Sequence, residues 1–229
     1  MIAIVAVAML LVTAFGGGDH PAATVVAPAS AARLLPAGPP AIEVVARLGT
    51  LRLQLPVNQS RITAIGYHGG TAGSLALAPL GAQANQGLIR RAWHAVIGGS
   101  SGKPRWFQLP GGLGASTSAL DVGAAAGTDV YSPVDGTIVG IGKVVLNGIV
   151  QGARIDIQPA GTPSLVVSVS QLTADPSLVV GSTVTAAGSK LGTVRDFSQA
   201  ERQALARYTN DAGNHVLLEV HAAQTLHVL

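Results

Sequence analysis

A chain of 229 residues with 48% hydrophobic content is long enough and apolar enough to bury a core, which excludes an intrinsically disordered protein. The net charge of +3 comes from scattered Lys and Arg residues that form no basic run, which argues against a nucleic-acid partner. The chain has no cysteine, so disulfides and thiolate metal sites are excluded. Abundant Gly and few aromatic residues favour an all-β fold of short strands joined by tight turns.

The chain begins with an apolar segment, residues 1–15. It is shorter than the roughly 20 residues that a bilayer-spanning helix needs, and it lacks a positively charged start. A linker rich in Gly, Pro and Ala follows at residues 16–40. Together these segments predict an extracytoplasmic protein, either secreted after cleavage of a signal peptide or held by a membrane anchor. The alternative is that residues 1–15 form a buried helix.

Residues 41–110 carry no motif and are predicted to form an N-terminal accessory region of mixed β/α structure. Alternating apolar and polar residues within Ile42–Leu55 predict a strand. Apolar residues at helical spacing predict a helix over Gln83–Ile97, ended by two glycines. His68 and His94 are isolated in the sequence, and a structural or exposed role is favoured for each over metal ligation.

From Leu120 onward the chain consists of short apolar runs separated by Gly, Pro, Asn and Asp, which is typical of a sandwich or barrel. The predicted strands are Leu120–Val122, Asp129–Ser132, Gly136–Ile141, Ala153–Gln158, Leu165–Leu172, Thr183–Ala186 and His215–His221. One segment between these predicted strands does not have a strand pattern. Ser198–Tyr208 has helical composition and opens with the capping box Ser198/Glu201, so it is predicted to be a short surface helix inserted before the last strand.

Three segments occur in the order and at the spacing of a known family. The first, Leu120–Val139, contains a strand with Asp121, a Gly-Thr turn and the run Val-Tyr-Ser-Pro-Val-Asp-Gly. The second, Val180–Gly192, has Val and Gly at regular spacing. The third, Asn214–Val220, is predicted to be the closing strand of the domain. Residues 116–222 therefore resemble the lysostaphin-like (LytM-type) peptidoglycan endopeptidases. The resemblance implies an all-β core, a LytM-type sheet of the duplicated-hybrid-motif sandwich kind. A biotinyl-type carrier domain is disfavoured, because neither Lys143 nor Lys190 has the Met-Lys setting of a carrier lysine.

The resemblance implies a zinc site, but most of its residues are replaced. Family members bind zinc through a His, an Asp four residues later and the second His of an H-x-H strand, with other histidines assisting the zinc-bound water. Here Asp121 matches the Asp, whereas Thr117 and Leu217 stand at the two lost ligand positions. His215 matches the first His of H-x-H, and Gln171 stands at the position of a lost acid/base His.

Asp121 and His215 are thus a remnant that is too small to hold zinc firmly. Glu219 and His221 share the strand face of His215 but lie too far along the strand to complete a compact site. Tyr131 and Glu219 are candidate residues of a ligand-binding groove. No cofactor is expected, and the predicted function is binding, regulation or scaffolding at the cell wall, with peptidoglycan or a cell-wall hydrolase as partner. The alternative is an active zinc-dependent peptidoglycan endopeptidase.

Overall fold

The structure, a computed structural model, describes residues 37–85, 104–146, 148–196 and 203–223. Leu35–Leu229 form one compact unit. The strands are β1 (Val44–Leu48), β2 (Leu51–Gln54), β3 (Ile62–His68), β4 (Ala78–Pro79), β5 (Ala82–Gln83), β6 (Arg105–Gln108), β7 (Ala119–Ala124), β8 (Asp129–Tyr131), β9 (Gly136–Leu146), β10 (Ile149–Pro159), β11 (Leu165–Ala174), β12 (Thr183–Val184), β13 (Lys190–Val194) and β14 (His215–Ala222). Two short 3₁₀ helices, η2 (Gln59–Arg61) and η3 (Ala204–Arg207), complete the described elements. The predicted all-β fold is confirmed.

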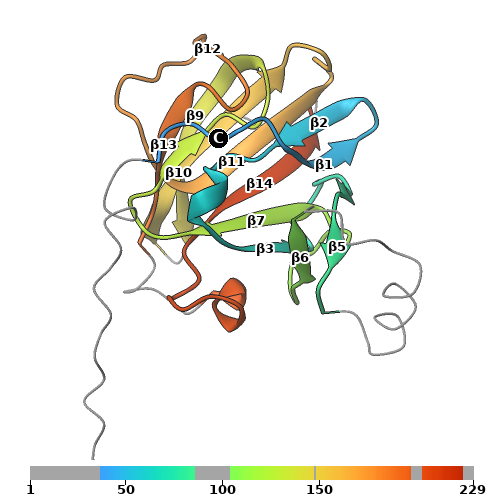
Figure 1. The fold of residues 1–229 in the computed structure, drawn as a ribbon. Helices are drawn as coiled ribbons and strands as arrows, with labels where there is room; N and C mark the ends of the chain where they lie inside the picture. The colour runs from blue at the N-terminus through green and yellow to red at the C-terminus, as the bar shows by residue number, and fades with distance from the viewer. Residues whose placement is uncertain (1–36, 86–103, 147, 197–202, 224–229) are drawn as a thin grey trace, which may run out of the picture. The chain divides into compact units, whose positions relative to one another are not determined.

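The main sheet has the strand order β12-β9-β10-β11-β14-β7-β3-β6-β5 (Figure 1). Its neighbours are antiparallel except at one end, where β6 runs parallel to both β3 and β5. β13 pairs with β11 and with β8. A smaller sheet has the order β2-β1-β4. The central strands β3, β7 and β14 come from distant parts of the chain, so their pairing brings residues together that no local pattern connects.

The core lies on one face of the central strands. Along β14, Val216, Leu218 and Val220 are each 0% exposed and belong to the main apolar cluster. The residues between them carry the polar groups of the strand, because successive side chains of a strand point to opposite faces. The predicted alternation of β14 is therefore confirmed, and its second face is available for polar chemistry.

The segment that the sequence sets apart as an accessory region contributes to the same unit. Its first part forms the hairpin of β1 and β2, in which Leu51 and Leu53 are buried and Arg52 is exposed, as alternation predicts. Its β3 pairs with β7 in the main sheet. The predicted helix over Gln83–Ile97 is wrong at its start, because Gln83 ends β5, which pairs with β6; residues 86–103 lie outside the described residues.

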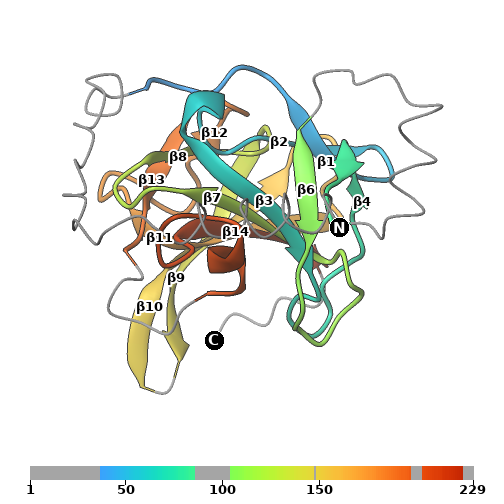
Figure 2. The same cartoon turned by 60° about the horizontal axis from the view of Figure 1, so that its bottom comes forward.

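The predicted surface helix Ser198–Tyr208 also needs correction. Residues 197–202, including the capping box, lie outside the described residues, and the described part forms only η3. Leu205 of η3 is 0% exposed and packs in a second apolar cluster with Ala64 and Leu109. η3 packs against β3; it is the red helical turn near the centre of Figure 2. The segment is thus tied to the sheet by a buried anchor, because a leucine side chain that leaves water stabilises its contact by about 2 kcal/mol.

None of the helices among the described residues is long and apolar enough to cross a bilayer. Residues 1–15, on which the prediction of a signal peptide or anchor rests, lie outside the described residues.

Candidate functional site

Asp121 lies at the centre of the main sheet. It is the third residue of β7, is 3% exposed, and stands opposite Leu217 of β14 on one side and Gly66 of β3 on the other. Residues that are directly opposite in an antiparallel pair share a face. Asp121 therefore belongs to the polar face of β14, on which His215 lies two residues before Leu217.

His68, the last residue of β3, reaches the carboxylate of Asp121. Its Nε2 lies 3.1 Å from Asp121 Oδ1, and its Nδ1 lies 2.6 Å from the carbonyl oxygen of Gly69. The sequence showed His68 only as an isolated histidine, in a glycine-rich segment 53 residues away from Asp121. The β3–β7 pairing brings the two together, and no spacing motif contains that information.

His215 approaches the same carboxylate oxygen from the other side. Its Nδ1 lies 2.6 Å from the carbonyl oxygen of Gly213, so this nitrogen carries a hydrogen and donates it. Its Nε2 lies 3.6 Å from Asp121 Oδ1, which is too long for a hydrogen bond but close enough for a charge interaction. Two imidazoles thus flank one buried carboxylate; we call His68, Asp121 and His215 the His-Asp-His cluster.

Burial and nearby charges shift the pKa values of this cluster in opposite directions. Burial by itself would lower the pKa of His68, but the hydrogen bond to Asp121 and the negative charge of that carboxylate together raise it to about 9. Burial by itself would raise the pKa of Asp121, but the nearby His215 and the hydrogen bond from His68 outweigh it and lower that pKa. The two pKa shifts are thus opposite in direction, and both favour an ion pair between Asp121 and His68.

The 3₁₀ helix η3 covers part of this polar face. A methyl group on Gly66 or on Gly123 would meet the Leu205 side chain, at 3.0 Å and 2.8 Å respectively. Gly66 is the partner of Asp121 in the sheet, and Gly123 is the partner of His215. Leu205 therefore rests on the sheet next to the cluster, which helps to keep water from Asp121 and His215, each 3% exposed.

Thr117 and Leu217, which the resemblance places at two ligand positions of the family, offer no atom suited to a zinc ion. Thr117 donates its hydroxyl to the carbonyl oxygen of Leu77 at 2.8 Å, and the aliphatic Leu217 has no donor atom for a metal. Asp121 already accepts a hydrogen bond from His68 on its Oδ1. Within the described ranges, no group of three or more His, Cys, Asp or Glu side chains is arranged to hold a metal ion.

Gln171, which the resemblance places at the position of the family's acid/base His, has an unusual backbone. Its φ is +65°, in the left-handed region that side chains other than Gly rarely adopt. The β10–β11 register explains this value: Ala153 pairs with Leu172 and Arg154 with Ser170, so Gln171 is the extra residue of a β-bulge. Its buried Oε1 has no hydrogen-bond partner among the described residues. A glutamine cannot exchange a proton at neutral pH, so this position supplies no acid or base.

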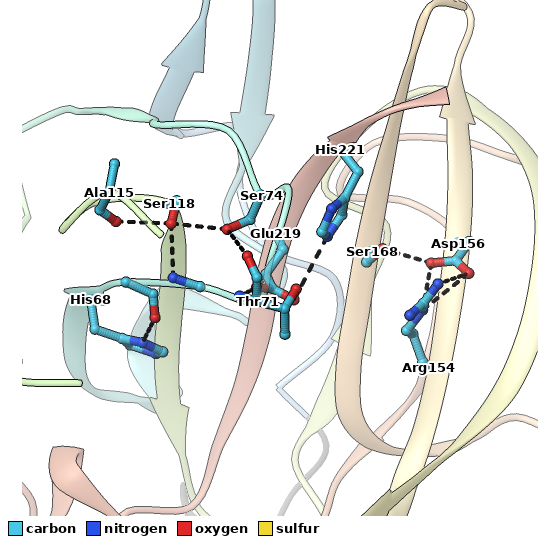
Figure 3. A network of polar contacts seen from close by, with 12 residues as sticks. His68, Thr71, Ser74, Ala115, Ser118, Arg154, Asp156, Ser168, Glu219 and His221 are labelled. Carbon is cyan, nitrogen blue, oxygen red and sulfur yellow. Dashed lines mark hydrogen bonds and ion pairs between the residues drawn. The ribbon is translucent and has the colours of Figure 1, made fainter. Parts of the chain in front are cut away.

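Glu219 lies farther along β14 and holds a loop in place. Its Oε1 accepts the backbone N–H of Thr71 at 2.6 Å, and its Oε2 accepts the Thr71 hydroxyl at 3.2 Å and lies 3.8 Å from His221 Nε2. Figure 3 shows these contacts and their continuation through Ser74 to Ser118, whose hydroxyl accepts the N–H of Gly70. The network fixes the segment after His68 on the sheet. Glu219 thus positions structure, and its carboxylate has its partners within the protein.

Tyr131, the other candidate groove residue, lies in a different pair of strands. It ends β8, which pairs with β13, and it is 7% exposed. Burial and the negative charge of Asp129 raise the pKa of its phenol, so it is neutral under ordinary conditions. Asp129 itself is paired with Lys190 at 2.6 Å.

Comparisons with known proteins find similarity at the level of solved structures. No family model matches the chain, and no curated protein matches it. The solved structures that match include Csd3 of Helicobacter pylori, with 16% identity, 74% of this chain and 31% of that chain covered, and a TM-score of 0.37. Lysostaphin matches with 16% identity, 48% and 38% coverage and a TM-score of 0.35. The M23 metalloprotease pseudoalterin from the deep sea matches with 16% identity, 76% and 72% coverage and a TM-score of 0.36.

The solved structures to which this chain is similar thus include M23 peptidases and lysostaphin, as the sequence motifs predicted. The chain matches about a third of the length of the Csd3 chain.

The chemistry that the described residues offer follows from the His-Asp-His cluster. In this cluster the carboxylate of Asp121 has one histidine ring on each side, and Asp121 and His215 are shielded from water. Such a cluster can hold a proton and donate hydrogen bonds within the sheet.

Proposed function

We propose that this chain is an exported, cell-wall-associated protein that uses its peptidase-type fold for binding, regulation or scaffolding. It does not cleave peptides in this proposal, and its partner is peptidoglycan or a cell-wall hydrolase. The observation that carries the proposal is the state of Asp121. Its Oδ1 is hydrogen-bonded to His68, and Leu217 stands directly across the strand pair from it. A carboxylate in that setting acts as a structural ion-pair partner.

The charge of the chain supports this partner. A net charge of +3 on a chain with few charged residues favours weak attraction to an anionic surface such as the cell wall. An ordered polar face along β7 and β14 would give such a protein hydrogen-bonding groups for a peptide or glycan.

The test measures binding to peptidoglycan and cleavage of peptidoglycan on the same protein sample. The full chain is incubated with purified peptidoglycan, the pellet is assayed for protein, and the supernatant is analysed for released muropeptides, with and without added zinc. We expect binding that weakens with salt, no released muropeptides, and less than one equivalent of zinc by metal analysis. Asp121→Asn is the matched variant. Release of muropeptides that a chelator and Asp121→Asn both abolish would establish the zinc endopeptidase instead.

Export is part of the proposal and has its own test. It rests on the apolar residues 1–15 and the linker that follows. A reporter enzyme that is active only outside the membrane, fused after Leu229, should be active in the full chain and silent when residues 1–15 are deleted. A silent reporter in the full-chain fusion would refute export.

A further inference from the structure

Most of the large apolar side chains that are exposed among the described residues gather along one edge of the main sheet. Six of these eight lie on β9, on β10 or in the loop before β12: Val139, Ile141, Val145, Val150, Val179 and Val180. Apolar residues that are scattered singly over a surface need no explanation, whereas a group of them on one sheet edge indicates an interaction surface.

The outer side of β9 is paired only at the start of the strand. β12 pairs with Gly136 and Thr137, and Ile138 exchanges backbone hydrogen bonds with Gly181 and Ser182. Over residues 139–146, β10 is the only strand among the described ones that pairs with β9. The backbone N–H and C=O groups that point away from β10 therefore have no strand partner there. An open edge of this kind is a template for pairing with another chain.

The far end of the β9–β10 hairpin extends beyond the neighbouring strand. Ala153 is the first residue of β10 that pairs with β11, so residues 149–152 pair with β9 alone in the described sheet. Figure 2 shows this end of the hairpin standing clear of the other described strands. Val145 and Val150 lie directly opposite each other there, 57% and 42% exposed. Because a two-stranded ribbon is only marginally stable in water, a third strand on β9 would stabilise it.

The charge of this edge indicates which kind of chain fits it. Lys143 is the only charged residue between Gly136 and Ala153. It is exposed, and it makes no ion pair with any described residue. Lys143 shares a strand face with Ile141 and Val145, because the three are alternate residues of β9. An acidic side chain on the added strand would therefore complement this face.

A second copy of this chain fits the edge less well. An antiparallel pairing of two β9 strands that sets Val145 against Ile141 of the copy places the two Lys143 side chains directly opposite each other. A pairing that sets Val145 against Val139 leaves the two lysines on one face and two positions apart. Like charges at such positions repel, and an edge lysine is a common protection against self-pairing.

We propose that the outer edge of β9, residues 139–146, binds an extended segment of another protein as an added strand. The segment carries apolar side chains at alternate positions, beside Ile141 and Val145, and an acidic side chain beside Lys143. In this mode of recognition the main-chain hydrogen bonds provide affinity and the alternate side chains provide specificity. β10 and β11 separate β9 from β14, so this surface is distinct from the His-Asp-His cluster. The inference goes beyond the proposed function and does not depend on whether peptidoglycan is cleaved.

The experiment is amide hydrogen exchange of the full chain, followed residue by residue with NMR, with and without a synthetic peptide. The probe is the end-blocked peptide Thr-Val-Thr-Val-Thr-Glu-Thr-Val-Thr, and the control peptide has Lys in place of Glu. We expect the Glu peptide to slow exchange within residues 139–146. The Lys peptide should bind about three- to tenfold more weakly, because it replaces an attraction to Lys143 by a repulsion. Unchanged exchange with the Glu peptide, or equal binding of the two peptides, overturns the proposal.

A charge reversal sharpens the test. Lys143→Glu should reverse the order of the two peptides, and an unchanged order would contradict the role of Lys143. Arg52→Glu is the matched control, because Arg52 is an exposed cation on β2 of the smaller sheet. It should leave the preference for the Glu peptide as it is, and a reversal there would also contradict the assignment.

Two further samples without peptide test the other occupants. Protection of residues 139–146 that rises with the concentration of the chain itself would assign the edge to a second copy. Protection by phosphatidylglycerol vesicles would assign it to a membrane surface. Either result in place of peptide binding overturns the proposal. Release of muropeptides is a separate readout, so failure of this inference and failure of the proposed function are distinguishable.

Discussion

Thr71 donates its backbone N–H to Glu219 Oε1 over 2.6 Å and thereby ties the loop after β3 to β14. The two residues are 148 positions apart in the sequence. Because His68 lies at the start of this loop, the contact links the position of the His68 ring to the strand that carries His215.

Glu219→Ala should lower the free energy of unfolding by about 1–3 kcal/mol, because it leaves a partly buried N–H and a hydroxyl without an acceptor. Urea unfolding of the purified chain measures this loss. Glu219→Gln keeps an acceptor oxygen and should cost less. An alanine variant as stable as the wild type would show that water replaces the carboxylate at no cost.

Glu219 should also make the stability of the folded chain depend on pH. Burial would raise the pKa of Glu219, but the contacts with His221 and Thr71 outweigh it and hold the folded-state value below 4.5. A depressed pKa stabilises the folded state above the unfolded value, and this stability is lost as the pH falls through the folded value. The difference in unfolding free energy between wild type and Glu219→Gln should therefore shrink between about pH 5 and about pH 3. A difference that stays constant over this range would contradict the assignment.

Gly112 allows the loop to pass close to the segment after His68. It has a φ of +83°, and a Cβ on it would overlap with the backbone oxygen of Gly69. Gly111 is a matched control, since it has a φ of +111° with nothing within 4 Å. Both alanine variants carry backbone strain, but only Gly112→Ala also displaces a backbone atom. We expect it to be less stable than Gly111→Ala by about 1–3 kcal/mol in thermal or urea unfolding. Equal stabilities would mean that the loop shifts freely.

Leu205 is expected to anchor η3 to the sheet. Leu205→Ala should destabilise the chain by about 2–4 kcal/mol, because it leaves a cavity in the second apolar cluster next to the His-Asp-His cluster. Leu113, which is 86% exposed, gives the control Leu113→Ala, with little expected change. An unchanged unfolding midpoint for Leu205→Ala would restore the view that this segment is a dispensable surface insertion.

Restoring the lost ligands tests the match between the sequence motifs and the family. Leu217 lies directly opposite Asp121 in the sheet, so Leu217→His places an imidazole across from the carboxylate. The double change Thr117→His with Leu217→His should bind about one zinc per chain and stabilise the fold by about 2.7 kcal/mol at a hundredfold excess over the dissociation constant. Leu217→His alone should bind more weakly. Titration followed by metal analysis measures both, and a double variant without zinc would show that the motif match is displaced.

Much of the strand order along the chain was predictable, because each strand carries a local signal. Gly, Asp, Asn and Pro end the apolar runs, and the alternation in β14 separates Val216, Leu218 and Val220 from the polar residues between them. Local sequence signals did not predict the segments whose structure depends on tertiary contacts. Helical composition at 198–208 did not predict that Leu205 would be buried, and β13 has no strong alternation of its own and is formed by pairing with β8 and β11.

The sequence by itself determined the all-β fold, because strand and turn signals are local. It also predicted, from the resemblance, that Thr117, Leu217 and Gln171 stand where the family has metal ligands and a base. Only the tertiary structure decided what Asp121 does instead. His68 is 53 residues away from Asp121, and its role comes from the register of β3 against β7 and from the fastening of the loop behind it. Strand pairing is non-local, so a lone histidine in the sequence became the counter-charge of the buried carboxylate only when the sheet was assembled.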